Sequence, residues 1–171
     1  MLNEILILVL VTFIPGLELR ASIPLGIIAN GVNIPFGIAS HGFGMSWPLV
    51  FVVCVVANIL LGFAVFFLLH RLVGFLTRFS SINRFYQRWI TRTQKKLKQG
   101  VDRYGVWGVA LFIAIPIPGT GVYTAGLGSY LLGVSWKKFA IANVVGVIIA
   151  GILVTAITLT GKGLFALLFG V

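Results

Sequence analysis

The sequence is poor in charge: only 9% of its residues are Asp, Glu, Lys or Arg, whereas soluble domains contain about 25%. Apolar residues make up 59% of the 171 residues. A water-soluble domain of this size cannot cover its surface with so few charged groups. The composition therefore excludes an ordinary soluble enzyme, a disordered protein and a soluble nucleic-acid binder. We expect an all-α integral membrane protein, because long apolar runs are typical of spanning helices.

Cysteine and histidine, which supply most metal sites and many nucleophiles, are also scarce. The chain has one cysteine, Cys54, and two histidines, His41 and His70. A single cysteine forms neither an internal disulfide nor a zinc site, and the two histidines lack the spacing of a ligand pair. The sequence also contains no nucleophile–base pair, no carboxylate pair and no phosphate-binding P-loop. We therefore expect a protein that is not an enzyme and that holds no metal and no cofactor.

Acidic residues number only three, against thirteen lysines and arginines, and nine of these basic residues lie between residues 71 and 103. Because Lys and Arg mark the cytoplasmic side of a membrane protein, we expect this segment to be cytoplasmic. As a helix it places Arg84, Arg88, Arg92 and Lys95 opposite an aromatic and aliphatic face, which is typical of a helix among lipid headgroups. Its role is either binding of anionic lipid or simple anchoring of the topology, and nucleic acid is not an expected partner.

Four apolar segments carry the fold, and two of them are unbroken. Trp47–Leu69 and Phe139–Leu159 contain no charged residue. Both reach the length of roughly 20 apolar residues that a spanning helix needs. The other two segments, Leu2–Ile28 and Tyr104–Leu132, are each interrupted near the middle. The sequence therefore predicts two transmembrane helices and two broken segments.

Proline and glycine make the two interruptions. Pro15 and Gly16 break the first segment, and Pro116, Pro118 and Gly119 break the second. Proline removes a backbone donor, and glycine permits a turn. The half-helices on either side are too short to cross the membrane, so we expect each segment to form a re-entrant hairpin that enters and leaves by one face. A kinked spanning helix is the alternative.

The two halves of the chain share one order of elements, in which a broken segment is followed by an unbroken helix. We expect a single membrane domain over residues 1–171, with a first repeat at 1–70, a basic amphipathic linker at 71–103 and a second repeat at 104–171. If both broken segments are re-entrant, each half crosses the membrane once, and the halves form an inverted repeat with both termini outside. Paired broken segments of this kind indicate a transporter.

Two motifs resemble those of a known family. PGLELRASIPLG (Pro15–Gly26) and IPIPGTGVYTAGLG (Ile115–Gly128) are similar to the paired motifs of the predicted small multidrug export protein family of prokaryotes. The resemblance covers nearly the whole chain. It implies a multi-pass protein of the prokaryotic plasma (inner) membrane that exports cationic or hydrophobic small molecules.

More distantly, the layout is similar to the DedA or VTT-domain superfamily, which has two re-entrant hairpins, each followed by a membrane helix. Members of that superfamily are associated with proton-dependent lipid transport, including flipping of undecaprenyl phosphate. The resemblance implies that Glu18 takes the acidic role and that the best guess for a substrate is a lipid carrier phosphate such as a polyprenyl phosphate. That superfamily also uses arginines in the second hairpin, whereas the only arginine in either hairpin here is Arg20, in the first.

Glu18 and Arg20 are the leading candidates for function, because a charge at the membrane centre costs about 2.5–3.5 kcal/mol. In an extended segment after Pro15 and Gly16, both side chains would lie on one side and could form an ion pair. Burial disfavours the charge of Glu18 and Arg20 favours it, so the carboxyl can load and release a proton. The alternative is structural, with Glu18 at the N-terminus of the following half-helix and Arg20 on a carbonyl.

The tip of the second hairpin is the other candidate site for substrate. A half-helix that begins at Val122 would point free N–H groups and the helix dipole into the protein, which favours an anion. Thr120, Gly121, Tyr123 and Thr124 lie at this tip, and Arg20 would supply the charge. The alternative is that glycines pack tightly there and that the hydroxyls bond to freed carbonyls.

Polar residues within the apolar helices complete the candidate set. Asn58 and Asn143 lie in the two unbroken helices and must face the protein interior, where each fits an interhelical hydrogen bond or a substrate contact. Ser22 is expected to join them. Four glycines are expected to pack helices together: Gly26, Gly62, Gly146 and Gly151.

The leading hypothesis is thus a proton-coupled secondary transporter of an amphipathic small-molecule or lipid substrate, with membrane lipids and protons as its partners. Export of cationic or hydrophobic small molecules is one alternative, and a membrane scaffold that transports nothing is another. Because four apolar segments are few to enclose a substrate site, we also expect a homodimer.

Overall fold

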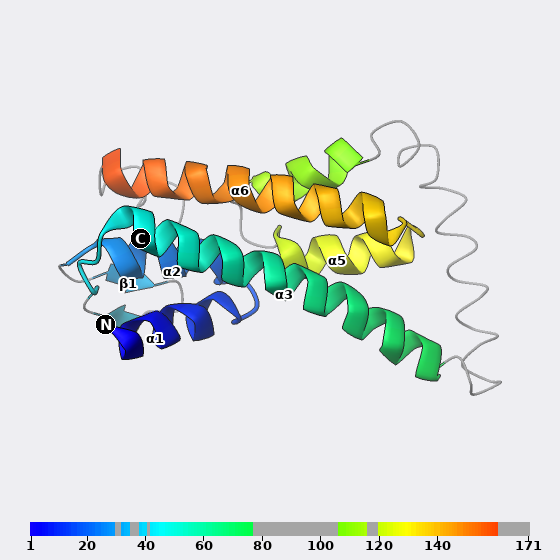
Figure 1. Ribbon diagram of the computed structural model, residues 1–171, viewed down its shortest axis with the longest axis horizontal. Helices are drawn as coiled ribbons and strands as arrows, with labels where there is room; N and C mark the ends of the chain where they lie inside the picture. Colours follow the sequence, from blue (N-terminus) through cyan, green and yellow to red (C-terminus); the bar gives the residue numbers. More distant parts are fainter. Residues whose placement is uncertain (30–31, 35–37, 41, 77–105, 116–119, 161–171) are drawn as a thin grey trace.

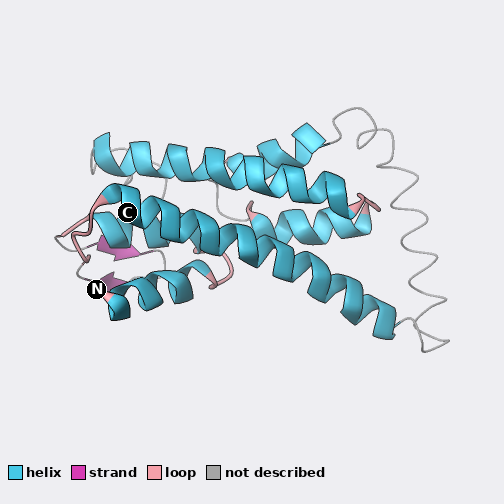
Figure 2. Ribbon diagram, in the orientation of Figure 1, coloured by secondary structure: helices cyan, strands magenta, loops and turns pink. Residues whose placement is uncertain are grey.

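The structure of the chain is a computed structural model that describes residues 1–29, 32–34, 38–40, 42–76, 106–115 and 120–160 (Figure 1). Helices make up nearly all of the described residues, as the composition predicts (Figure 2). The exception is a short antiparallel pair of strands, β1 (Val32–Ile34) and β2 (Ile38–Ser40), in which Asn33 lies opposite Ala39. Strands of three residues are too short to leave a periodic signal, so the sequence did not predict them.

The first broken segment folds into two short helices that pack against each other, α1 (Leu2–Thr12) and α2 (Glu18–Ile27). The chain turns back at Pro15 and Gly16, where the sequence predicts the break. Gly16 has φ +87°, in the left-handed region that glycine adopts without a steric penalty. The two helices have 11 and 10 residues, which corresponds to lengths of about 16 and 15 Å.

The second broken segment has the same plan. Residues 106–114 form one helix, and α5 (Val122–Leu131) forms the next. The predicted breaking residues, Pro116, Pro118 and Gly119, fall between them and lie outside the described residues.

Two long helices follow the broken segments, α3 (Trp47–Leu76) and α6 (Trp136–Thr160). Both are long and apolar enough to cross a membrane. Helix α3 extends beyond residue 70, where the predicted linker begins, because residues 72–76 continue the apolar run. The rest of that linker, with Arg84, Arg88, Arg92 and Lys95, lies outside the described residues.

Figure 1 shows the two pairs of short helices opening toward opposite ends of the molecule, with the described residues that flank the breaks near its middle. Helices α3 and α6 run in opposite directions along them. Helix α3 contacts α1, α2, α5 and α6, and α2 also contacts α6. The two long helices therefore pack along the described parts of both broken segments.

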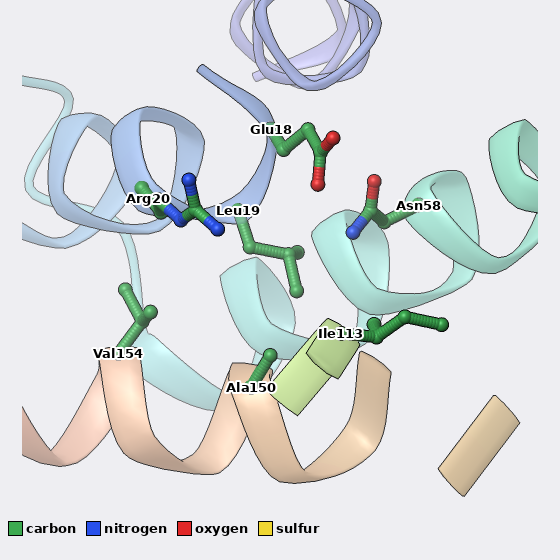
Figure 3. A pocket seen from close by; sticks show the side chains of 7 residues that line it. All are labelled: Glu18, Leu19, Arg20, Asn58, Ile113, Ala150 and Val154. Atoms are coloured by element: carbon green, nitrogen blue, oxygen red, sulfur yellow. The ribbon is translucent and has the colours of Figure 1, made fainter. Parts of the chain in front are cut away.

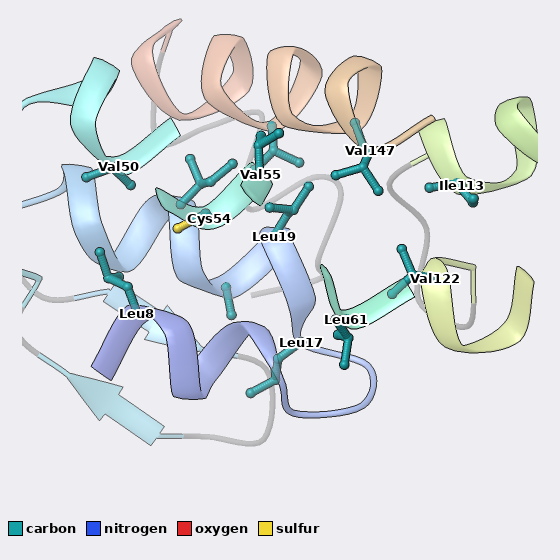
Figure 4. Packing of buried hydrophobic residues seen from close by; sticks show 14 of the residues in the cluster. Leu8, Leu17, Leu19, Val50, Cys54, Val55, Leu61, Ile113, Val122 and Val147 are labelled. Atoms are coloured by element: carbon teal, nitrogen blue, oxygen red, sulfur yellow. The ribbon is translucent and has the colours of Figure 1, made fainter. Parts of the chain in front are cut away.

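Side chains from all of these elements meet in one packed core (Figure 4). Leu8 of α1, Ile23 of α2, Val50 of α3, Val122 of α5 and Val147 of α6 are each fully buried. The outer faces of α3 and α6 are also apolar, which is opposite to the pattern of a soluble protein. Exposed side chains on these faces include Val52, Val56, Leu60, Ile141, Ile148 and Ile152.

Glycines let the helices approach closely, as the sequence predicts. A Cβ at Gly26 would lie 2.6 Å from Val50 Cγ1, and one at Gly151 would lie 2.6 Å from Val55 Cγ2. Gly146 packs in the same way against residues 106–114, and Gly62 packs against the Asn143 side chain. Small residues at helix contacts are how membrane proteins gain packing energy without a hydrophobic driving force between helices.

Gly62→Ala should lower the free energy of unfolding by about 1–3 kcal/mol, the usual effect of overpacking. The new methyl group would overlap the Asn143 amide, which donates to Ile59 O (3.0 Å) and links α6 to α3. Reversible unfolding in mixed detergent micelles measures the change. Gly128→Ala is the matched control, since nothing lies within 4 Å of a Cβ at that position. Equal stability of the two variants would contradict this packing.

Candidate functional site at the hairpin tips

The described ends of the two broken segments contact each other near the centre of the molecule, and the two charged residues of α2 lie at this contact. Glu18 and Arg20 are each only 5% exposed. Glu18, the first residue of α2, has φ +45°. A non-glycine residue in this region carries a backbone strain of order 1–3 kcal/mol and is stable only when its surroundings hold it. The contacts of its carboxylate provide that support.

Glu18 caps a helix that belongs to the other half of the chain. Its Oε2 accepts a hydrogen bond from the backbone N–H of Val122 at 3.3 Å, and the backbone N–H of Tyr123 also interacts with the carboxylate. These two residues open α5, whose own N-cap residue, Gly121, makes no side-chain cap. A carboxylate at this position satisfies unpaired N–H groups and meets the positive end of the helix dipole.

Arg20 binds the polar groups that precede α5. Its Nη2 donates to Thr120 O and to Thr120 Oγ1, both at 2.7 Å, and lies 3.5 Å from Ile115 O. The Thr120 hydroxyl in turn donates to Ile115 O at 2.6 Å. Carbonyl groups at a helix end lack partners within the helix. Arg20 therefore satisfies acceptors at the same tip where Glu18 satisfies donors.

Glu18 and Arg20 do not form with each other the ion pair that the sequence left open. Among the described residues, the structure has one ion pair, between the Met1 amino group and the Glu4 carboxylate. The segment expected to be extended is instead the first turn of α2. Figure 3 shows the carboxylate of Glu18 and the guanidinium of Arg20 as separate groups that line the same pocket.

A small cavity lies beside this contact (Figure 3). Its volume of about 10 Å³ is near the lower limit for a single water molecule. Two of its lining residues, Arg20 and Asn58, each keep a buried polar atom, Nη1 and Oδ1, without a hydrogen-bond partner in the described part of the chain. The other lining residues are Glu18, Leu19, Ile113, Ala150 and Val154.

The other predicted site residues form hydrogen bonds or contacts, and only some of these lie at the tips. The Tyr123 hydroxyl donates to Phe13 O, which ties α5 to the end of α1. Ser22 Oγ donates to Glu18 O at 3.0 Å, and Thr124 Oγ1 donates to Gly121 O at 3.3 Å, each within its own half of the chain. Asn143 forms an interhelical bond, described above, whereas the Asn58 amide faces the Glu18 carboxylate. The predicted residues that the structure brings together at the tips are Glu18, Arg20, Asn58, Thr120, Gly121 and Tyr123.

Sequence reasoning missed the backbone and apolar groups of the site. The N–H of Val122 and the carbonyls of Phe13 and Ile115 contact the polar side chains, but their residue types give no signal for this. The apolar lining residues of α6, Ala150 and Val154, resemble any other core residue. The only sequence signal for these groups is the position of the breaks, which predicts where backbone groups lose their partners.

Comparison with known families places the chain in one of them. The family model described as Putative small multi-drug export protein matches residues 18–153, more than half of the chain. The chain belongs to this family. The matched region of the small multi-drug export protein family begins at Glu18 and includes Asn58 and the described tip of the second broken segment. No curated protein and no solved structure matches the chain.

Membership in the small multi-drug export protein family confirms the resemblance found in the sequence. The description of the family is that of an export protein and names no enzyme activity. Together with two helices of spanning length, it identifies a membrane protein.

Gly121→Ala should lower the free energy of unfolding by about 1–3 kcal/mol. Gly121 has φ +129°, and a Cβ there would overlap the Glu18 carboxylate. The loss should be smaller when the same change is made in Glu18→Ala, because the overlap is then removed and only backbone strain remains. Unfolding of the two single variants and the double variant measures this. An equal loss in both backgrounds would show that the carboxylate does not lie against Gly121.

Proposed function

We propose that the protein is a proton-coupled secondary transporter, in which two re-entrant hairpins meet near the middle of the membrane and Glu18 carries the proton. The observation that carries the proposal is the buried Glu18 carboxylate at the N-terminus of α5, beside Arg20 and at the contact between the two hairpins. Ionisable residues inside a membrane are rare and mark substrate or proton pathways. Family membership supports export across a membrane.

Helix lengths support re-entrant hairpins rather than kinked spanning helices. Helices α1, α2 and α5 have 10 or 11 residues, so each covers about half of the roughly 30 Å hydrocarbon core. Helices α3 and α6 are long enough to cross it. A turn inside the membrane is tolerated where protein covers its polar groups, and the contacts of Glu18 and Arg20 supply this cover.

The arrangement of the helices supports an inverted repeat. The hairpins open toward opposite ends, and α3 and α6 run in opposite directions (Figure 1). Each half then contributes one hairpin and one crossing of a prokaryotic inner membrane. We place the basic linker at 71–103 in the cytoplasm, with both termini outside. The exposed apolar faces of α3 and α6 contact lipid or a second copy, and we retain a homodimer as part of the proposal.

Proton coupling follows from the two environments that Glu18 can occupy. While the hairpin tips touch, the N–H groups of α5 and the guanidinium of Arg20 stabilise the charged carboxylate against the cost of its burial. When the tips separate, those N–H groups are lost, and a carboxylate still shielded from water takes up a proton. Proton binding and tip separation are therefore linked, so a pH gradient can drive the movement of the tips.

The mixed lining of the cavity supports an amphipathic substrate, since polar side chains of α2 and α3 lie next to apolar residues of α6. A lipid carrier phosphate, such as a polyprenyl phosphate, is the first candidate. The second candidate is a cationic or hydrophobic small molecule, which the description of the family favours. For a cation, Glu18 would be the attracting group and Arg20 would oppose binding.

Glu18→Gln should abolish transport driven by a pH gradient while the protein still folds. Glutamine keeps the shape of the side chain and an acceptor for the Val122 N–H, but it carries no proton. In liposomes, the wild type should flip a labelled polyprenyl phosphate under a pH gradient, and Glu18→Gln should not exceed empty liposomes. Glu4→Gln is the matched control, because Glu4 lies at the start of α1 and pairs only with the amino terminus. It should transport as the wild type does.

Three other outcomes of this experiment are decisive. Unchanged pH dependence in Glu18→Gln would contradict proton coupling through Glu18. If the wild type moves an organic cation under the gradient and not the lipid, the second candidate substrate replaces the first. If no cargo is moved, and replacing Glu18 with Gln and Arg20 with Met together changes no phenotype, the protein is a scaffold.

A further inference from the structure

We infer that the Glu18 carboxylate occupies a binding site for the anionic group of the substrate, an oxyanion such as a phosphate, and competes with it for the same donors. This inference rests on the proposed function and names the chemical group that the tip site binds. While the tips touch, the Glu18 carboxylate is the anion at the N-terminus of α5. When Glu18 moves away, the anionic group of the substrate binds to the same donors.

The donors at the tip are those that bind an oxyanion. The first N–H groups of α5 point at the Glu18 carboxylate, and a helix N-terminus with free N–H groups is an anion site by geometry and by dipole. Beside it, Arg20 has a second nitrogen, Nη1, that is buried and unpartnered within the described residues, on a side chain that is 95% buried. A guanidinium with an unused donor is suited to a phosphate or a carboxylate.

The charge balance of the site allows only one anion at a time. With Glu18 ionised, the charges of Glu18 and Arg20 cancel, so a second anion gains nothing from the site. Once Glu18 is protonated, Arg20 and the N-terminus of α5 leave the site positive. The other groups that face Glu18 are the uncharged Tyr123 of α5 and Asn58 of α3. Helix α6 and residues 106–114 contribute only apolar side chains to the cavity, and residues 116–119 contain no ionisable side chain.

Exchange of the Glu18 carboxylate for the substrate's anion requires the tips to move apart, because the cavity is small and the backbone of Glu18 is strained. A cavity of about 10 Å³ is close to the minimum for one water molecule and holds no phosphate group. An oxyanion can therefore enter only when the tips part, and the same movement withdraws Glu18 from α5. Withdrawal also lets the strained backbone of Glu18, at φ +45°, relax. Uptake of a proton by Glu18 and binding of the anionic group are therefore linked events.

Removal of the internal anion should improve binding of the external one. In detergent at neutral to alkaline pH, Glu18→Gln should bind dodecyl phosphate about tenfold more tightly than the wild type, the gain expected if the carboxylate holds the donors in about nine tenths of molecules. At acidic pH the difference should shrink, because a proton on Glu18 has the same effect as the substitution. Comparison of the two proteins at one pH cancels the titration of the ligand itself.

Control variants separate this competition from a loss of folding. Glu18→Ala, which removes the acceptor altogether, should show the same gain, and thermal unfolding checks that both variants are folded. Arg20→Gln should lose affinity for dodecyl phosphate at both acidic and alkaline pH. Lys137→Gln should bind as the wild type does, because Lys137 is an exposed lysine of α6 that does not line the cavity.

Three probes distinguish the source of the anion. Tighter binding of dodecyl phosphate than of inorganic phosphate identifies a lipid-linked group, and equal binding identifies the free anion. The inference is overturned if folded Glu18→Gln binds neither phosphate more tightly than the wild type, or if dodecyltrimethylammonium binds more tightly than both.

The binding experiment and the transport experiment test different claims, so each claim can be contradicted without the other. Loss of pH-driven transport in Glu18→Gln, without a gain in phosphate affinity, would remove only the inference. The predicted gain in affinity, in a protein that transports nothing under a pH gradient, would remove only the coupling.

Discussion

Buried backbone groups that have no partner within a helix must find one elsewhere in the protein, and this constraint organises the centre of the molecule. The described ends of the broken segments leave such N–H and carbonyl groups beside the breaks. Arg20 bonds to the carbonyls that precede α5, and Glu18 bonds to the N–H groups that begin it. Two charged side chains of one hairpin thus complete the backbone of the other. The backbone dipoles in turn stabilise the two buried charges.

The surrounding helices and glycines hold Glu18 and Arg20 in contact with the start of α5. Helices α3 and α6 enclose the tips, and glycines at their interfaces allow the backbones to approach. Gly121 leaves the space in which the Glu18 carboxylate lies. Glu18 itself is held at a strained φ of +45°. The contact thus combines a strained backbone with one titratable group, which is the combination on which the proposed coupling rests.

Much of the fold could be predicted from the sequence, because its signals are physical. Proline and glycine within apolar runs indicate the breaks, uninterrupted runs indicate α3 and α6, and an acid in an apolar segment indicates a site. The sequence suggested that Arg20 lies at the tip with Thr120, whereas the Val122 N–H could not be predicted as the partner of Glu18, since it lies about a hundred residues away and is brought there by helix packing. Whether the backbone at Glu18 is extended or helical was likewise left open by the local sequence.

Asn58 and Asn143 illustrate the limit of sequence reasoning within the site. Both follow an alanine in an unbroken apolar helix, and the sequence treats them alike. The structure bonds Asn143 to Ile59 O and places Asn58 beside the Glu18 carboxylate. The difference depends on how each helix is rotated against its neighbours, which no local pattern records.

The most direct measurement is the coupling energy between the two hairpin tips, obtained from a double-mutant cycle of Arg20→Met and Thr120→Val on the free energy of unfolding. Arg20 Nη2 and Thr120 Oγ1 are 2.7 Å apart, and hydrogen bonds between helices in membranes contribute about 1 kcal/mol. We predict a coupling energy of that size. Losses that add to within about 0.3–0.5 kcal/mol, as they do for independent sites, would contradict a contact between the tips.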